Sequence, residues 1–286
     1  MTIMTANQYK AKKVFGKASF YVANIIVGLV FVSPLLYMLI SSFNADRSLP
    51  VQIRSFFEFF PSTYTLGNFE AVFTRIPMLR YIGNSLLYSL TSVILGLIVN
   101  SMAGYALAKY TTGLTKFLFG FIIVMLIIPF EGITLSLFII INRLGMMNTP
   151  FAVILPSIMN CFYIFMFRQF FLGIPDSLIE AAEIDGAGSF AIFFKIVVPM
   201  SIPVFITVFL LDFFAKWNDF YWPMLTLTDS SLFNVQLAIN MFSREPPYHF
   251  GNVMASLTTV TLPIIVLFFF LQKYYIGGIV AQGIKE

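Results

Sequence analysis

Long apolar stretches recur along this chain, and shorter polar segments separate them. A helix needs about 20 largely apolar residues to cross the hydrocarbon core of a membrane. Stretches of this length occupy residues 20–41, 82–108, 117–141, 151–171, 200–223 and 253–275. The pattern therefore predicts an all-α membrane protein with six transmembrane helices.

The composition supports this prediction. Hydrophobic residues make up 59% of the chain and charged residues 10%, whereas an ordinary soluble domain carries about 25% charged residues. A soluble core cannot absorb so much apolar surface, so we expect membrane lipid around the protein. The net charge of +4 is explained by the placement of cations beside the spans, and no nucleic-acid partner is expected. The single cysteine, Cys161, excludes an internal disulfide.

The distribution of lysine and arginine predicts the orientation. With the N-terminus inside, the cytoplasmic side collects Lys10, Lys12, Lys13, Lys17, Lys109, Lys116, Arg168, Lys195, Lys273 and Lys285. The outer side then holds Arg47, Arg54, Arg75, Arg80, Arg143 and Arg244, partly offset by acidic residues. An even number of spans places both termini in the cytoplasm.

The same pattern predicts three parts. Residues 1–79 hold an N-terminal cytoplasmic segment, the first span and an outer segment with Phe56, Phe57, Phe59 and Phe60, which we expect to pack on the membrane surface or on another chain. Residues 80–275 form a core with five spans and a polar loop at about 173–199. Residues 276–286 form a tail. The run 231–242 is too short to span and predicts an amphipathic turn or helix at the surface.

The polar loop joins the fourth and fifth spans and contains the sequence EAAEIDGAGSFAIFFKIVVP (180–199). Ser177 and Glu180 have the spacing of a capping box. They predict a short helix over residues 178–185 that ends at Gly186, since glycine adopts left-handed dihedral angles at low cost. A second short helix follows, with Ser189 as its candidate cap and Pro199 as its end.

The first loop helix has a distinctive face. Leu178, Ala181, Ala182 and Asp185 share it by their spacing. The two alanines allow close approach of a partner, whereas the alternative is a solvated helix that merely joins two spans.

The residues of this loop resemble a known family. Glu180-Ala181-Ala182, then Asp185-Gly186-Ala187 and Pro199, resemble the EAA loop of importer-type ABC transporter permeases. The flanking sequences FMFRQFFLGIPDSLIEAAEIDGAG and FFKIVVPMSIP are similar to the carbohydrate branch, specifically the maltose-type second permease subunit. Further similarities are PSTYTLGNF, NSL (84–86), GYALAKY (104–110), RLGMMNT (143–149) and WNDFYWPML (217–225). The resemblance extends from about residue 20 to the C-terminus.

The resemblance implies a type I ABC importer permease (MetI-like) fold in the bacterial inner membrane. The loop would be the coupling helix that sits in a groove of a cytoplasmic ATPase. The coupling residues would be Glu180, Ala181, Ala182, Asp185, Gly186 and Ala187. Expected partners are a homologous second permease, an ATPase dimer and an extracytoplasmic solute-binding protein.

Nucleotide chemistry is expected to belong to the partners. The chain has no GxxxxGK[ST] loop for phosphates. We therefore expect no enzymatic activity and no bound cofactor, with ATP and magnesium held by the ATPase subunits.

Ionisable residues inside the predicted spans are candidates for the substrate pathway, because charges in a bilayer usually face a bundle interior or a wet cavity. Glu131 lies in the third span. Asp212, Lys216 and Asp219 share one face of the fifth span at i, i+4 and i+7. One interpretation is a neutralised Asp212–Lys216 pair that holds the bundle together. The other is a substrate pathway formed by Glu131, Asp212, Lys216, Trp217, Asn218 and Asp219.

Lys216 departs from the family pattern, in which this position is usually small or neutral. A lysine here leads to the hypothesis of an anionic sugar substrate. His249 is the sole histidine and is predicted in an outer loop, near the docking face for a binding protein. Since it has no evident partner residues, we expect no catalytic site and no metal site.

Other functions stay open from the residues alone. One is an ion-coupled secondary transporter that carries protons on Glu131 or Asp212. A second is a membrane-embedded enzyme, which the absence of a nucleophile–base pair disfavours. A third is an ABC permease for another solute class.

Overall fold

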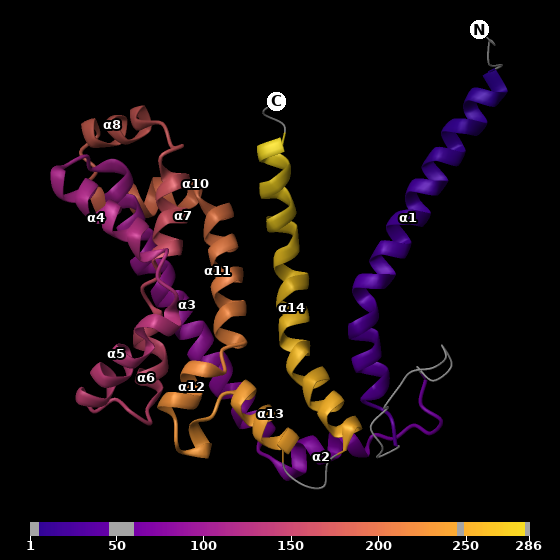
Figure 1. Ribbon diagram of the computed structural model, residues 1–286. Coiled ribbons are helices and arrows are strands. Elements are labelled where there is room, and N and C mark those ends of the chain that lie inside the picture. The colour runs from indigo at the N-terminus through magenta and orange to yellow at the C-terminus, as the bar shows by residue number, and fades with distance from the viewer. Residues whose placement is uncertain (1–5, 46–59, 245–248, 284–286) are drawn as a thin grey trace. The chain divides into compact units, whose positions relative to one another are not determined.

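The computed structural model describes residues 6–45, 60–244 and 249–283, and their side chains except those of 6–16, 18 and 273–283. Helices dominate the described part (Figure 1). Contacts divide the chain into two units. One unit combines Met1–Arg75 with Glu245–Thr259, and the other combines Ile76–Arg244 with Val260–Glu286.

The first unit contains α1 (Ala6–Ser41), α2 (Gly67–Arg75) and the beginning of α14 (Phe250–Gly283). The Asn68 side-chain amide connects them, since it donates to the Ser42 carbonyl at 2.9 Å and to the Asn44 carbonyl at 2.7 Å. Gly251 of α14 packs against the same amide, where a side chain would collide with Asn68. Phe56, Phe57 and Phe59, predicted to pack on a surface, lie outside the described residues.

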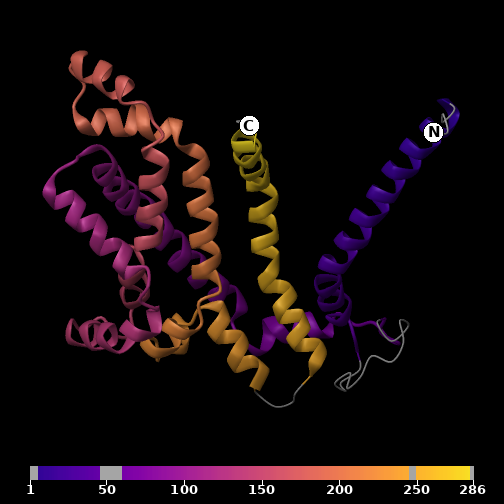
Figure 2. The ribbon, with the colours of Figure 1, turned by 45° about the horizontal axis from the view of Figure 1, so that its top comes forward.

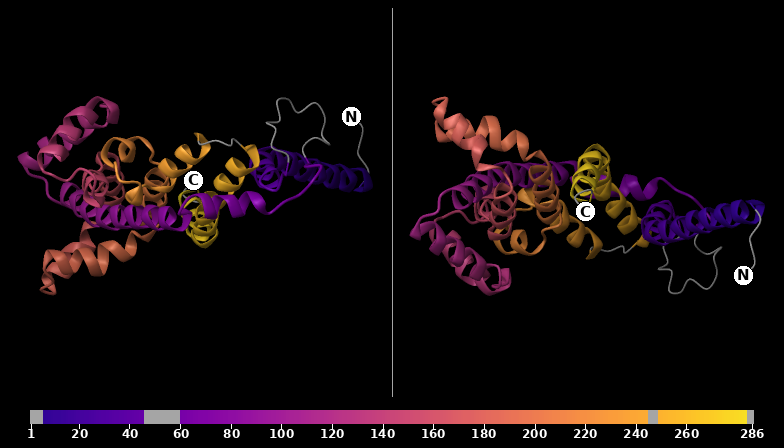
Figure 3. Two further views of the ribbon diagram at one scale, coloured as in Figure 1. Left: turned by 90° about the horizontal axis from the view of Figure 1, so that it is seen from below. Right: turned by 90° about the horizontal axis from the view of Figure 1, so that it is seen from above.

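The second unit is built on the long helix α3 (Met78–Lys109), which packs against α7 (Cys161–Phe171) and α11 (Ile202–Trp217). α3 and α7 approach closely at Gly104. A side chain there would lie 2.7 Å from Cβ of Phe167 and 3.0 Å from the Arg168 nitrogen. The segments α4–α5 and α8–α10 extend to opposite sides of α3 (Figure 3).

Besides the part of α14 from Val260 onward, the second unit contains further short elements. They are α4 (Gly113–Met125), α5 (Phe130–Arg143), α6 (Pro150–Ile154), the 3-10 turn η2 (Leu155–Ser157), α8 (Asp176–Ile184), α9 (Ser189–Ile192), the π-helix η3 (Phe193–Val197), α10 (Val198–Met200), α12 (Tyr221–Thr226), the 3-10 turn η4 (Ser230–Leu232) and α13 (Val235–Arg244). α8 lies at one end of the unit, and α12 and α13 lie at the other (Figures 1 and 2).

Among the described residues, four helical segments are long and apolar enough to cross a membrane. They are Ser19–Ser41, Met78–Lys109, Pro150–Phe171 and Phe250–Gln272. Two bent pairs raise the number to six if each pair is one span. The predicted stretch 117–141 is thus a bent pair of helices, and the predicted stretch 200–223 begins at the bend of the other pair.

The third predicted span is two helices, α4 and α5, with a bend of 108° between them. Pro129 is the residue before α5 and has extended dihedral angles. Proline has no N–H to donate to the helix before it, which favours a helix start at this point. The fifth predicted span bends by 80° between Met200 and Ile202, and its helix α11 ends at Trp217.

The predicted amphipathic run at 231–242 is confirmed as α13. One face of α13 is buried and carries Val235, Ala238, Ile239 and Phe242, and Leu237 is buried as well. The predicted boundary between the core and the tail, at residue 275, lies inside a helix. α14 continues to Gly283, so that residues 276–283 of the predicted tail are helical. The His249 carbonyl accepts the first backbone hydrogen bonds of α14, from Asn252 and Val253.

Candidate functional site: a surface loop and a polar helix face

The loop helix α8 is terminated by a glycine, as the sequence predicts. Gly186 has φ +81°. Its N–H donates to the Glu183 carbonyl at 3.0 Å, and the Ala187 N–H donates to the Ala182 carbonyl at 2.9 Å. These two bonds form a Schellman motif, which satisfies the last carbonyls of the helix and fixes the direction of the chain after it.

The beginning of α8 differs from the prediction. The helix begins at Asp176 after Pro175, and no side chain caps it. The predicted capping box between Ser177 and Glu180 is wrong, because both residues already lie inside the helix. Ser189 likewise is the first residue of α9, after Gly188 at the cap position.

Two side chains from the end of α3 hold the loop instead. The Lys109 ammonium lies 2.7 Å from Oδ1 of Asp176 and donates to the Ile174 carbonyl at 2.8 Å. The Tyr110 hydroxyl lies 3.2 Å from Oγ of Ser189. Sequence reasoning missed these contacts, since 67 residues separate Lys109 from Asp176.

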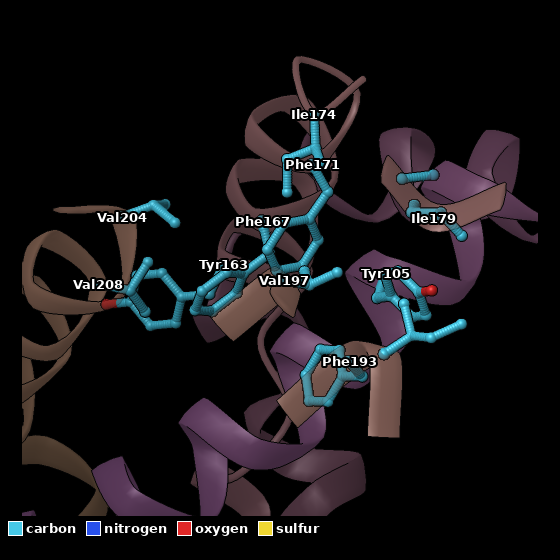
Figure 4. Packing of buried hydrophobic residues seen from close by; sticks show 12 residues of the cluster. Tyr105, Tyr163, Phe167, Phe171, Ile174, Ile179, Phe193, Val197, Val204 and Val208 are labelled. Atoms are coloured by element: carbon cyan, nitrogen blue, oxygen red, sulfur yellow. The ribbon is translucent and has the colours of Figure 1, made fainter. Parts of the chain in front are cut away.

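The inner face of α8 belongs to the apolar cluster of the second unit (Figure 4). Ile179 is buried in this cluster, and Ala182 and Ala187 pack against it. The predicted outward face is therefore wrong for Ala182, since only Ala181 of the two alanines is exposed.

The outer face of α8 is apolar at its centre. Leu178 is 42% exposed and Ile184 is 87% exposed, with Ala181 between them. Exposed carboxylates of Glu180, Glu183 and Asp185 border this strip. A single exposed apolar side chain such as Ile184 is common on protein surfaces. Here, however, the exposed apolar side chains form a strip that carboxylates border, on a helix that Lys109 and the apolar cluster hold in place. These are features of a protein-docking surface.

A helical path, broken at Ser201, leads from the loop to α11. It passes through α9, the π-helix η3 and α10, and Pro199 lies inside α10. The predicted break at Pro199 is wrong, because the bend of 80° comes after Met200. Phe193 and Val197 anchor this path in the same cluster as Ile179 (Figure 4).

The polar face of α11 contains an ion pair. Nζ of Lys216 lies 3.8 Å from Oδ1 of Asp212. The Asp212 side chain is 3% exposed and that of Lys216 is 21% exposed. The structure thus brings together two residues of the predicted pathway, in the pairing that the first interpretation expects.

The other end of this face borders a small polar pocket. Lys216 and Asp219 line it together with Ser85, Ser89 and Asn234. Its volume is about 10 Å³, which is room for roughly one water molecule. The Asp219 carboxylate accepts the Trp222 N–H at 3.3 Å, which holds the turn between α11 and α12.

The remaining pathway candidates are separated. Trp217 is fully buried and stacks on Phe213 with ring centroids 5.7 Å apart. Asn218 is exposed, and its Oδ1 accepts a hydrogen bond from Gln236 at 3.3 Å. Glu131 is exposed in the first turn of α5, beyond the 108° bend. Glu131 is therefore not part of the buried polar group on α11.

A family model described as "Binding-protein-dependent transport system inner membrane component" matches residues 92–279. The chain belongs to this family. The predicted permease family, its all-α fold and its place in the inner membrane are thereby confirmed.

The permease is similar to curated proteins over most of its length. It is 36% identical over 263 residues to the arabinooligosaccharides transport system permease protein AraQ of Halalkalibacterium halodurans, covering 91% of this chain and 93% of that protein. It is 28% identical over 251 residues to the lactose transport system permease protein LacG of Rhizobium radiobacter, covering 88% and 90%.

The fold is also similar to a solved structure. That structure is the crystal structure of a bacterial ABC transporter involved in the import of the acidic polysaccharide alginate. The TM-score is 0.79 at 21% identity, and the match covers 96% of this chain and all of that chain. At this identity the likeness supports the fold of the permease.

A further polar feature of the permease was not predicted from the sequence. Its fourth span is interrupted at residues 158–160, between η2 and α7. Asn100 of α3 satisfies the open backbone there, since its Nδ2 donates to the Ile158 carbonyl and its Oδ1 accepts the Asn160 N–H, both at 2.9 Å. The sequence signal for this contact was a polar side chain, Asn100, in the middle of the second apolar stretch.

Proposed function

We propose that this permease is one of two membrane-spanning subunits of an ATP-driven importer for a sugar or oligosaccharide. An extracytoplasmic binding protein delivers the substrate, and a pair of cytoplasmic ATPase subunits binds ATP and magnesium. The α8 loop passes the closure of the ATPase pair to the spans, in an alternating-access cycle. The observation that carries the proposal is the exposed apolar strip on a firmly anchored α8.

The substrate class rests on the relatives. AraQ and LacG are named for the transport of arabinooligosaccharides and lactose. The two carboxylates beside Lys216 offset its charge, which favours a neutral sugar over the anionic sugar that the lysine alone suggested.

The orientation rests on charge. Lys109 contacts α8, and Lys195 lies in η3 of the same loop. Cations at the ends of spans favour the cytoplasmic side. We therefore place α8 and both termini in the cytoplasm, and the end with α12 and α13 outside, where the binding protein docks.

The residues of the loop take two roles in this proposal. Leu178, Ala181 and Ile184 contact the ATPase, and the carboxylates of Glu180 and Asp185 favour a basic rim on its groove. Ala182, Gly186 and Ala187 have a structural role instead. They hold α8 against the apolar cluster and end the helix at a fixed position.

Substrate contact is proposed for the accessible polar side chains. Lys216, Asn218 and Asp219 are at least partly exposed. Glu131 is exposed on α5 and is proposed as a separate contact. Asp212 and Trp217 support this face from the interior.

The docking role is tested by Ile184→Glu in the permease co-expressed with its partner subunits. Ile184 makes few contacts within the chain, so the variant should fold normally. We expect the affinity for the ATPase to fall at least about tenfold, since an apolar anchor becomes a buried charge. Leu66→Glu is the matched control, since Leu66 is 71% exposed on the proposed outer side. Equal ATPase binding by both variants would contradict the docking role.

The transport role is tested by uptake into vesicles. ATP-dependent uptake should need the permease pair, the ATPase pair and the binding protein together. Thermal shifts of the co-purified binding protein with neutral and acidic oligosaccharides then identify the sugar. Gradient-driven uptake by this chain without an ATPase would contradict the proposal and favour a secondary transporter.

A further inference from the structure

The cation Arg168 lies at the junction of three helices of the second unit. It belongs to the last turn of α7, and its Nε donates to the Leu107 carbonyl of α3 at 3.1 Å. Its guanidinium carbon lies 3.7 Å from the centroid of the Phe119 ring of α4. The Phe119 ring in turn stacks on Phe165, with ring centroids 6.3 Å apart. Arg168 is therefore held in one place, at the point where α3, α4 and α7 meet.

The guanidinium of Arg168 has hydrogen-bonding capacity beyond these contacts. A guanidinium carries five N–H donors, and among the described residues its one hydrogen-bond acceptor is the Leu107 carbonyl. Within the same described part of the chain, Arg168 has no carboxylate partner. Its terminal amino groups can therefore donate to an anion from outside the chain, and phosphate oxygens fit the fork of a guanidinium well.

The surroundings of Arg168 carry an excess of positive charge. Helices α3, α4 and α7 contain no aspartate or glutamate. Lys116 is exposed on α4 one turn before Phe119, and this spacing places the two residues on one face of the helix. Lys109, at the same end of α3, is balanced by Asp176. Arg168 and Lys116 are thus two cations of one junction, and the three helices that form it supply no carboxylate.

An exposed apolar surface begins beside these cations. No residue of α4 is buried, and Leu114, Phe117 and Phe121 are exposed. These three side chains are spaced at i, i+3 and i+7, so that they form a strip along the helix. Because α4 belongs to a bent pair that is apolar enough to cross a membrane, lipid chains can cover this strip.

The two features together fit an anionic phospholipid. A phosphate headgroup matches the cations, and acyl chains match the strip on α4. The proposed ATPase surface does not cover this junction, since α8 and α4 extend to opposite sides of α3 (Figure 3). Anionic lipids of the cytoplasmic leaflet attract lysine and arginine at the ends of spans. A second permease is the alternative cover for α4, but an apolar helix face would leave both cations unbalanced.

We propose that the junction of α4 and α7 binds an anionic phospholipid of the cytoplasmic leaflet. The terminal amino groups of Arg168 and the ammonium of Lys116 bind the phosphate, and the acyl chains lie along the strip on α4. The bound lipid fastens α4 to α7, and it thereby holds the first helix of the bent pair in place. This inference rests on the proposed function for its orientation, with these cations on the cytoplasmic side.

Lipid binding is measured on the purified, complete transporter by native mass spectrometry. The probes are phosphatidylglycerol and phosphatidylcholine with identical acyl chains. The wild type should prefer phosphatidylglycerol about twentyfold, since each of two cations near an anionic lipid contributes about fivefold. Lys116→Gln should lower this preference about fivefold, and Arg168→Gln should lower it at least as much. Arg143→Gln is the matched control and should change nothing, since Arg143 is exposed in the last turn of α5, beyond the bend.

Two further arrangements make the result decisive. Lys116→Gln keeps the test valid if Arg168→Gln fails to assemble, because the Lys116 side chain is exposed. A photoreactive phenylalanine analogue in place of Phe117 should cross-link to lipid. A wild-type lipid preference in Lys116→Gln and in any assembled Arg168→Gln variant, or cross-links from position 117 to a second subunit, would overturn the site. An absence of ATP-driven uptake would instead overturn the proposed function, because lipid binding is measured without ATP or sugar.

Discussion

The ammonium of Lys109, at the end of α3, lies 2.7 Å from Oδ1 of Asp176 at the first residue of α8. The same ammonium donates to the Ile174 carbonyl at 2.8 Å. One side chain thus holds both the entry of the loop and the start of its helix to the longest helix of the unit. On the proposed function, we expect a loop fastened in this way to pass a displacement on to α3.

Replacing Lys109 should loosen the loop without unfolding the protein. The Asp176 side chain is 76% exposed, whereas that of Lys109 is 9% exposed, so we expect a contribution toward the upper end of the roughly 0.2–1 kcal/mol of exposed ion pairs. Lys109→Met should therefore raise the rate of amide hydrogen exchange in α8 about threefold, with a small change in global stability. Lys116→Met serves as the control, and unchanged exchange in α8 would show that the contact does not hold the loop.

Gly186 should be sensitive to any side chain because of its dihedral angles. With φ +81° it lies in the left-handed region, where a side chain costs about 1–2 kcal/mol. Gly186→Ala should reduce ATP-driven uptake and ATPase binding together, since the Schellman motif is weakened. Gly188→Ala is the matched control, since Gly188 has φ −74° and open space around it. Gly186→Asn should restore part of the function, because asparagine tolerates this region.

Gly104 should not tolerate alanine for a different reason, the close approach of two helices. A methyl group there would lie 2.7 Å from Cβ of Phe167. α3 and α7 must then separate, at a cost of about 1–3 kcal/mol. The melting temperature of Gly104→Ala should fall clearly below that of Gly83→Ala. Gly83 is in the same helix with open space around it, where alanine is the better helix former. Equal melting temperatures would show that the two helices can separate freely.

Asn100 should be the most costly of these positions. Asn100→Leu leaves the Ile158 carbonyl and the Asn160 N–H without their partner. Each buried polar group left unpaired costs about 1–3 kcal/mol. We expect a large loss of melting temperature or of assembled complex. Asn24→Leu should have little effect, because Asn24 is exposed and bonds only within its own helix. A stable Asn100→Leu variant would show that the interruption finds other partners.

Part of this architecture was predictable from local pattern. The length of an apolar stretch predicts a span without knowledge of its neighbours, because each helix that crosses the hydrocarbon core needs about 20 apolar residues of its own. The end of α8 at Gly186 was also predictable, because a glycine after a short helical run is a local signal. The start of α8 was not, since Lys109 holds it from a distant part of the chain.

The sequence by itself determined the membrane class, the family resemblance, the polar loop and the i, i+4 spacing of Asp212 and Lys216. All of these depend on composition, order or spacing along one helix. Only the tertiary structure decided that Ala182 faces inward, that Glu131 lies apart from Asp212, and that Asn100 bridges an interrupted span. These outcomes depend on which helices pack together, because burial and hydrogen-bond partners come from residues that are remote in the chain.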